Sequence, residues 1–160
     1  MSNFEQTASL LKTLMSSLMS SDNDERTKAE GALNTEWVAT QPQTVLGSLA
    51  YLVHRDSEPK ARAFAAILLR RISFQNAAAA ENKEDQHTVW SVVPESVHQT
   101  VKAELLGALQ RETDRSARHK LCDTISEIVD HEGQDGWAEL LGALYACAQD
   151  GNALLRESAY

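Results

Sequence analysis

Few residues of this chain have the types and spacing that catalysis or metal binding requires. The five histidines are scattered along the sequence: His54, His87, His98, His119 and His131. None forms an HExxH motif or a His/Cys pair, and the phosphate-binding and nucleophile motifs GxxxxGK[ST], GxGxxG and GxSxG are absent. His119 and Asp123 share a helical face, but this spacing is more typical of a surface pair than of a catalytic dyad. We therefore expect no enzymatic activity, no cofactor and no metal site.

Carboxylates form the one ordered cluster of charge. Asp123, Glu127 and Asp130 recur at i, i+4 and i+7, which places them on one face of a helix. Residues 1–74 hold eight acidic and eight basic residues, whereas residues 75–160 hold fifteen and seven, so the whole net charge of −8 lies in the second part. An acidic surface repels nucleic acids and membranes and attracts basic partners. The alternative is that this acidity serves only solubility.

The elements that position these residues repeat along the chain. Residues 61–72 form an apolar helical pattern that follows an arginine, with apolar residues three and seven positions after Arg62. The same phase recurs at Arg26, Arg118 and Arg156, with spacings of 36, 56 and 38 residues. A polar residue suited to a helix start lies four positions before each arginine. This period is typical of stacked helical hairpins such as HEAT or armadillo repeats.

The sequence therefore predicts an all-α fold, a HEAT-repeat α-solenoid of antiparallel helix hairpins. We expect repeat 1 at about 3–40, repeat 2 at about 42–74, repeat 3 at about 94–131 and a partial repeat 4 at about 135–160. The intervening segment 75–93 includes the alanine-rich residues 76–86. We interpret it as a surface loop, held at its far end by Trp90, Val92 and Val93.

The last repeat lacks a complete second helix in this sequence. A hairpin repeat buries its apolar face only against its neighbours, so we expect the chain to be the N-terminal part of a longer superhelix. Trp137, Leu140, Leu144 and Leu155 should then be incompletely packed. Cys122 and Cys147 lie 25 residues apart among apolar neighbours, which indicates buried, reduced thiols.

Several stretches resemble a known receptor family. Residues 10–15 (LLKTLM) and 19–30 (MSSDNDERTKAE) resemble the opening hairpin of importin-β-type nuclear transport receptors. Residues 65–72 (AAILLRRI) resemble the B helix of their second repeat. Residues 101–106 (VKAELL) and 118–123 (RHKLCD) resemble the third repeat of the importin subunit beta-3 (karyopherin beta-3) branch. The alanine-rich loop is longer than the connection that is usual in this family.

The resemblance implies a receptor that carries proteins through nuclear pores, between cytoplasm and nucleus. In this family the first helix of each hairpin is called the A helix and the second the B helix. The resemblance implies that the inner B helices bind the GTPase Ran in its GTP form, and that the outer A helices contact Phe-Gly repeats of nucleoporins. Basic cargo proteins would bind mostly to repeats beyond this chain. No membrane and no direct nucleic-acid contact is expected. Periodicity alone also fits a HEAT scaffold that assembles a multiprotein complex without Ran.

A helical wheel of the B helices selects candidate Ran-contacting positions that point away from the core. These residues are Asn34, Ile67, Arg70, Arg71, Phe74, Asp123, Glu127 and Asp130. Apolar anchors beside charged side chains are typical of protein-binding faces. The wheel leaves open whether Ile67 and Phe74 instead pack on adjacent repeats.

Overall fold

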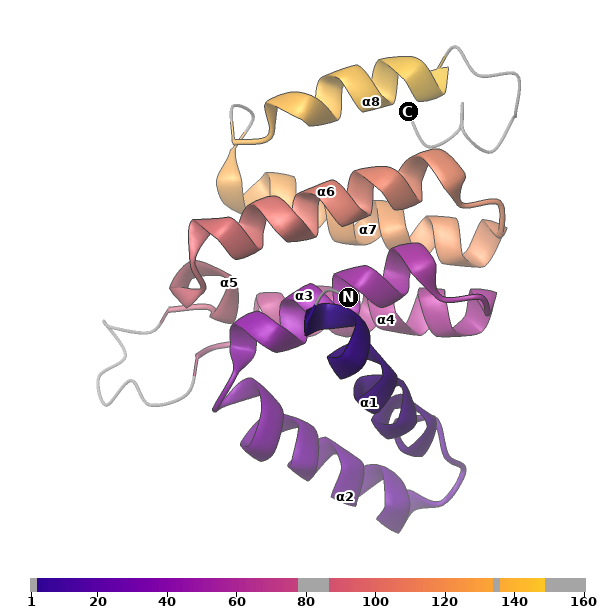
Figure 1. Cartoon of the computed structure of the whole chain (residues 1–160), viewed down its shortest axis with the longest axis vertical. Helices are drawn as coiled ribbons and strands as arrows, with labels where there is room; N and C mark the ends of the chain where they lie inside the picture. Colours follow the sequence, from indigo (N-terminus) through magenta and orange to yellow (C-terminus); the bar gives the residue numbers. More distant parts are fainter. Residues whose placement is uncertain (1–2, 78–86, 134–135, 149–160) are drawn as a thin grey trace.

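A computed structural model describes residues 3–77, 87–133 and 136–148, and this part of the chain is almost entirely helical (Figure 1). The elements in chain order are α1 (Asn3–Leu18), α2 (Asn23–Ala32), the short π-helix η1 (Leu33–Val38), α3 (Pro42–Arg55), α4 (Pro59–Ser73), α5 (Val89–Val92), α6 (Glu95–Arg111), α7 (Arg115–Glu132) and α8 (Ala138–Ala148). The predicted all-α fold is confirmed.

Consecutive helices pair into antiparallel hairpins that stack side by side. The first hairpin is α1 with α2 and η1, the second is α3 with α4, and the third is α6 with α7 (Figure 1). The A helices follow one another in the order α1, α3, α6 and α8. Of the B helices, α4 and α7 pack closely on each other. This stacking of hairpins is the arrangement of a HEAT-type solenoid.

Local sequence signals explain where the helices begin and end. Asp22 caps α2, because its Oδ1 accepts hydrogen bonds from the backbone N–H groups of Asp24 and Glu25. Asp114 caps α7 in the same way. Proline occupies the first position of α3 and of α4, where it loses no helical hydrogen bond. Gly133 ends α7 with a φ of 83°, a conformation that glycine adopts without strain.

The periodic arginines have one shared structural role. In each of the three hairpins the arginine Nη1 donates to the backbone carbonyl six residues earlier, at the turn between the A and B helices. The pairs are Arg26 to Ser20 (2.9 Å), Arg62 to Asp56 (2.9 Å) and Arg118 to Glu112 (2.6 Å). These carbonyls lack an intrahelical partner, so the guanidinium groups satisfy them and tie each turn to its B helix.

The structure adds one feature to repeat 1 and corrects one detail of the 75–93 segment. In repeat 1, α2 continues at Leu33 as a π-helix. Trp37 in this π-helix is half-buried. Val92 is exposed, whereas Trp90 and Val93 hold the end of the 75–93 segment by being buried. Residues 78–86 lie outside the described part of the chain.

The packing of α8 also differs from expectation. Trp137 and Leu140 were expected to be incompletely packed, yet both are buried. Trp137 belongs to the hydrophobic core cluster, and the ammonium group of Lys102 lies 5.9 Å from its ring centroid. The exposed apolar side chains of this helix are instead Leu141 (71%) and Tyr145 (67%). Leu155 lies outside the described residues.

Candidate partner-binding surface

The candidate surface is built on α4 and α7, which pack side by side. Small residues at Ala65 and Ala66 of α4 are fully buried and let α7 approach closely. Thr124 of α7 fixes the register, because its hydroxyl lies 2.9 Å from the carbonyl oxygen of Ala66 and 2.9 Å from that of Lys120. Two helices joined in this way present their outward side chains on one continuous surface.

Three of the sequence-predicted residues join at the contact between these helices. The Nε of Arg70 lies 3.8 Å from the Oε2 of Glu127, and the Oε1 of Glu127 lies 3.7 Å from the Nε2 of His131. Phe74 stacks on the His131 imidazole with centroids 4.1 Å apart and planes at 5°. Arg70, Phe74 and Glu127 therefore form one contiguous group together with His131.

Four more predicted residues surround this group and are solvent-exposed. Ile67 leaves 41% of its surface exposed, whereas its apolar neighbours in the chain, Ala66 and Leu68, are buried. Arg71 of α4 and Asp123 and Asp130 of α7 are also exposed. We call Ile67, Arg70, Arg71, Phe74, Asp123, Glu127 and Asp130 the α4/α7 surface. It combines an apolar side chain with both signs of charge.

Asn34 does not belong to this surface. It is exposed on η1, whose main packing partners are α2 and α3. The role of Phe74 is also more structural than that of Ile67. Besides His131, it contacts the Trp90 ring at 6.1 Å, and it is half-buried. The two apolar candidates thus differ: Ile67 faces solvent, whereas Phe74 packs on the following repeat.

Sequence reasoning missed His131 and Thr124. His131 follows Glu127 at i+4, a spacing that indicates a surface pair, and this signal was available in the sequence. The buried hydroxyl of Thr124 gave no such signal, because its partner Ala66 lies 58 residues earlier in the chain. Contacts at such a separation depend on how the hairpins stack, which helical periodicity does not encode.

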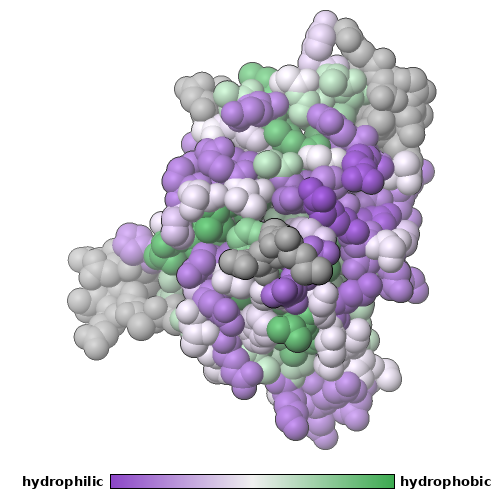
Figure 2. Space-filling view, in the orientation of Figure 1, coloured by the Kyte–Doolittle hydropathy of each residue, from purple (hydrophilic) through white to green (hydrophobic). Residues whose placement is uncertain are grey.

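The described residues contain neither a metal-type cluster nor a membrane-spanning helix. Within 3–77, 87–133 and 136–148, no group of three His, Cys, Asp or Glu side chains is arranged to hold a metal ion. No helix in the same ranges has both the length and the apolar character needed to cross a membrane. Polar side chains cover most of the face in Figure 2, and its apolar patches are small and separate.

Comparisons with known proteins point to one family. A family model described as IPO5-like, TPR repeats, matches residues 113–160. Importin subunit beta-3 of Saccharomyces cerevisiae is 29% identical over 157 residues, which cover 98% of this chain and 14% of that protein. Like HEAT repeats, TPR repeats are stacked helical hairpins.

Solved structures give the same result. The crystal structure of Kap121p bound to RanGTP matches with a TM-score of 0.76 and 28% identity, over 97% of this chain and 14% of that chain. Kap121p bound to Nup53p matches with a TM-score of 0.74 and 28% identity, again over 97% and 14%. The resemblance to the importin-β superfamily and its beta-3 branch is confirmed. The chain spans 14% of the length of these relatives.

Proposed function

We propose that this chain, an importin-β-type HEAT-repeat segment resembling the beta-3 branch, is part of a nuclear import receptor and binds Ran in its GTP form. The observation that carries the proposal is the match to Kap121p bound to RanGTP, which extends over 97% of this chain. The receptor would move between cytoplasm and nucleus through the nuclear pore. The relatives are much longer than this chain, so the activity of a complete receptor would also depend on repeats outside it.

The α4/α7 surface is the proposed contact with Ran. Its exposed Ile67 supplies an apolar anchor, and the acids Asp123 and Asp130 supply charge for basic groups of the partner. Arg70 is already paired with Glu127, so Arg71 is the arginine more available to acidic groups of Ran. An apolar centre with a charged rim is the arrangement that gives protein interfaces both affinity and fast association. Asn34 on η1 is proposed as a separate, weaker contact.

Other partners follow from the relatives in the same way. Kap121p has been crystallised with Nup53p, and we extend nucleoporin binding, including Phe-Gly repeats, to the outer A helices of the present protein. Kap121p has also been crystallised with the SUMO protease Ulp1p and with Pho4p. Basic cargo proteins are proposed to bind mostly to repeats outside this chain.

Charge reversal on α7 tests the Ran contact. Asp123→Lys combined with Glu127→Lys should weaken binding of GTP-loaded Ran at least about tenfold at low salt and less at high salt, because salt screens exposed charges. The binding is measured by fluorescence anisotropy or surface plasmon resonance. GDP-loaded Ran should bind much more weakly to the unchanged protein.

The matched control reverses two acids elsewhere. Glu58, before α4, and Glu139, on α8, are both exposed, and changing both to Lys alters the net charge by the same amount. This control should bind Ran nearly as well as the unchanged protein. If both double variants lose the same Ran affinity, the effect comes from the change in overall charge and not from the α4/α7 surface. Equal binding of GTP- and GDP-loaded Ran would favour the scaffold function instead.

A further inference from the structure

A polar pocket lies on the edge of the stack, away from the α4/α7 surface. It has a volume of about 520 Å³ and is formed by the C-terminal ends of α3 and α6 together with the turns that follow them. Its lining residues are Tyr51, His54, Arg55, Asp56, Ser57, Arg62, Ala108, Arg111, Glu112 and Thr113. Ala108 alone among these has no polar side-chain atom. Ligand pockets of this size are usually lined mainly by apolar side chains. The polar and charged lining of this pocket instead suits a charged ligand.

The two acids of the pocket are already neutralised. The Glu112 carboxylate accepts hydrogen bonds from both the Nε (2.7 Å) and the Nη2 (3.0 Å) of Arg62. These hydrogen bonds raise the pKa of Arg62 above its ordinary value. Asp56 pairs with Lys12 of α1 at 3.0 Å. The negative ends of the helices are covered too, because Arg62 and Arg118 donate to the turn carbonyls. The pocket therefore presents little free negative charge to a ligand.

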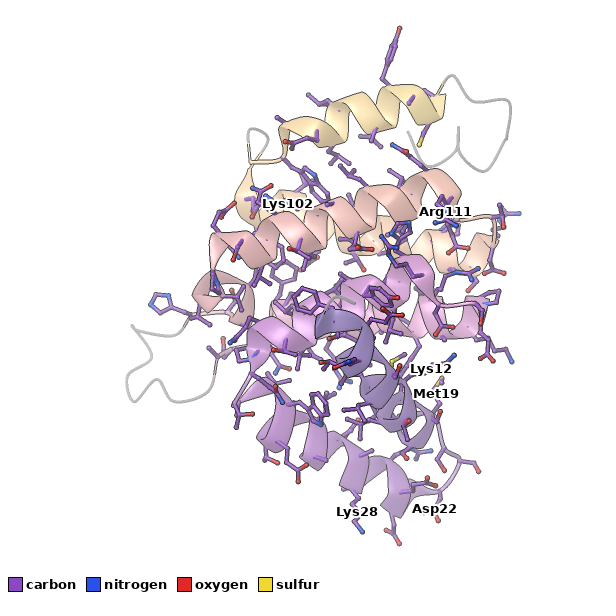
Figure 3. All side chains as sticks on the ribbon, viewed as in Figure 1. Lys12, Met19, Asp22, Lys28, Lys102 and Arg111 are labelled. Carbon is purple, nitrogen blue, oxygen red and sulfur yellow. The ribbon has the colours of Figure 1, made fainter. Side chains whose placement is uncertain are left out.

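Two guanidinium groups remain available on its rim. Arg111 is exposed and pairs with no acid in the described part of the chain; Figure 3 labels it at the end of α6. Arg55 is half-exposed: its Nε lies 3.3 Å from Glu104 and its guanidinium carbon lies 5.5 Å from the Tyr51 ring centroid, while its terminal nitrogens make no hydrogen bond within the described residues. The lining residues include three arginines and two acids, so the pocket lining carries one net positive charge in a chain whose net charge is −8.

A buried imidazole adds an unsatisfied polar atom. The His54 side chain is only 10% exposed, and its Nδ1 lies 2.7 Å from the Oε2 of Glu104. Its Nε2 is buried without a partner among the described residues. The ring lies so close to Gly107 that a Cβ there would be 2.5 Å from its Cε1. The absence of a side chain at Gly107 therefore makes room for the His54 ring against α6, and the enclosed Nε2, 2.9 Å from that Cβ position, is an unpaired polar atom that costs stability.

We propose that this pocket binds an acidic peptide segment of another protein, with a carboxylate side chain held by Arg55 and Arg111. Arginine binds carboxylates through paired N–H groups, and clusters of arginines are a recurring device for recognising acidic motifs. The hydroxyl groups of Ser57, Thr113 and Tyr51 line the same pocket and can bind the peptide backbone. The inference does not depend on Ran binding, which concerns a different surface.

The test uses a fluorescein-labelled peptide of alternating Glu and Ser, with a Lys and Ser peptide as the probe of opposite charge. Binding is followed by fluorescence anisotropy. The Glu peptide should bind saturably and the Lys peptide should not. Arg111→Glu should weaken binding by about tenfold or more, and Arg55→Glu by a similar factor, because each replaces an attraction by a repulsion.

Lys28→Glu is the matched control, since Lys28 is also exposed but lies on α2, outside both the pocket and the α4/α7 surface. It should change the affinity less than about twofold if the pocket is the site, because surface charges away from a site act weakly. Equal losses for Lys28→Glu and Arg111→Glu would overturn the proposal in favour of non-specific attraction. Failure of the Glu peptide to saturate would also overturn it. Displacement of the peptide by equimolar inorganic phosphate would do the same and would indicate a simple anion site.

Discussion

The junction between the first and second hairpins differs from the junction between the second and third. Between hairpins two and three, both layers pack: α3 lies against α6 and α4 lies against α7. Between hairpins one and two, the main contacts are those of α1 with α3 (Figure 1), and η1 adds a smaller contact with α3. The first junction is therefore closed mainly on the A side, and the second on both sides.

The same difference appears in the ion pairs that cross the junctions. In each case a base of one hairpin reaches an acid in the turn of the next: Lys12 pairs with Asp56, and Arg62 pairs with Glu112. Lys12 is 40% exposed and lies 3.0 and 3.3 Å from the two Asp56 oxygens, whereas Arg62 is only 16% exposed; the two carboxylates are 5% and 3% exposed. The acids occupy equivalent turns, but the base is a partly exposed lysine on α1 in one junction and a nearly buried arginine on α4 in the other.

Arg62→Ala should have the largest effect on stability. It leaves Glu112 buried without its cationic partner, and breaking a buried pair from one side costs about 3 kcal/mol or more. The free energy of unfolding is measured by urea denaturation followed by circular dichroism. Arg62→Ala combined with Glu112→Ala should be less destabilised than Arg62→Ala alone, because it removes the unpaired charge. If Arg62→Ala is as stable as the unchanged chain, the ion pair at the second junction is no stronger than the one at the first.

Thr124→Val should have an intermediate effect. Valine keeps the shape of threonine but removes the hydroxyl that reaches the Ala66 carbonyl across the α4–α7 contact. Loss of one hydrogen bond of this kind costs about 1 kcal/mol, again measured by urea denaturation. Thr13→Val is the control, since its hydroxyl is exposed and bonds only within α1. If both variants lose the same stability, the hydroxyl of Thr124 does not contribute to the junction.

Lys12→Ala should have the smallest effect. The hydrogen bond with Asp56 raises the pKa of Lys12, but the lysine remains largely hydrated, so its pair contributes little to stability. Asp56 also accepts a hydrogen bond from the Glu58 N–H and is not left without a partner. Adding salt should reduce even this small difference between Lys12→Ala and the unchanged chain. A loss as large as that of Arg62→Ala would remove the distinction between the junctions.

Part of this structure could be predicted from the sequence because it is local. The phase of Arg26, Arg62 and Arg118 identified the hairpins, and all three arginines bind their turns in the same way. Phe74 and Ile67 could not be separated by a helical wheel. Their environments depend on α7, whose residues lie more than 40 positions further along the chain.

Trp137 was misjudged for a similar reason. Periodicity shows that an indole is apolar and near a helix start, but it does not show that Lys102 lies over its ring. The π-helix at Leu33–Val38 was also unexpected, since no residue in it breaks the helical pattern. The polar pocket likewise arises from two turns that are more than 50 residues apart in the sequence.

Hydrogen-exchange mass spectrometry with and without GTP-loaded Ran tests the central claim that the α4/α7 surface is the binding surface. In the free chain, amides of α2 and η1 should exchange faster than those of α4 and α7, because the first junction has fewer packed contacts on the B side. Addition of GTP-loaded Ran should slow exchange in α4 and α7, and GDP-loaded Ran should not. Slowing confined to α3 and α6, or no change with either form, would contradict the account.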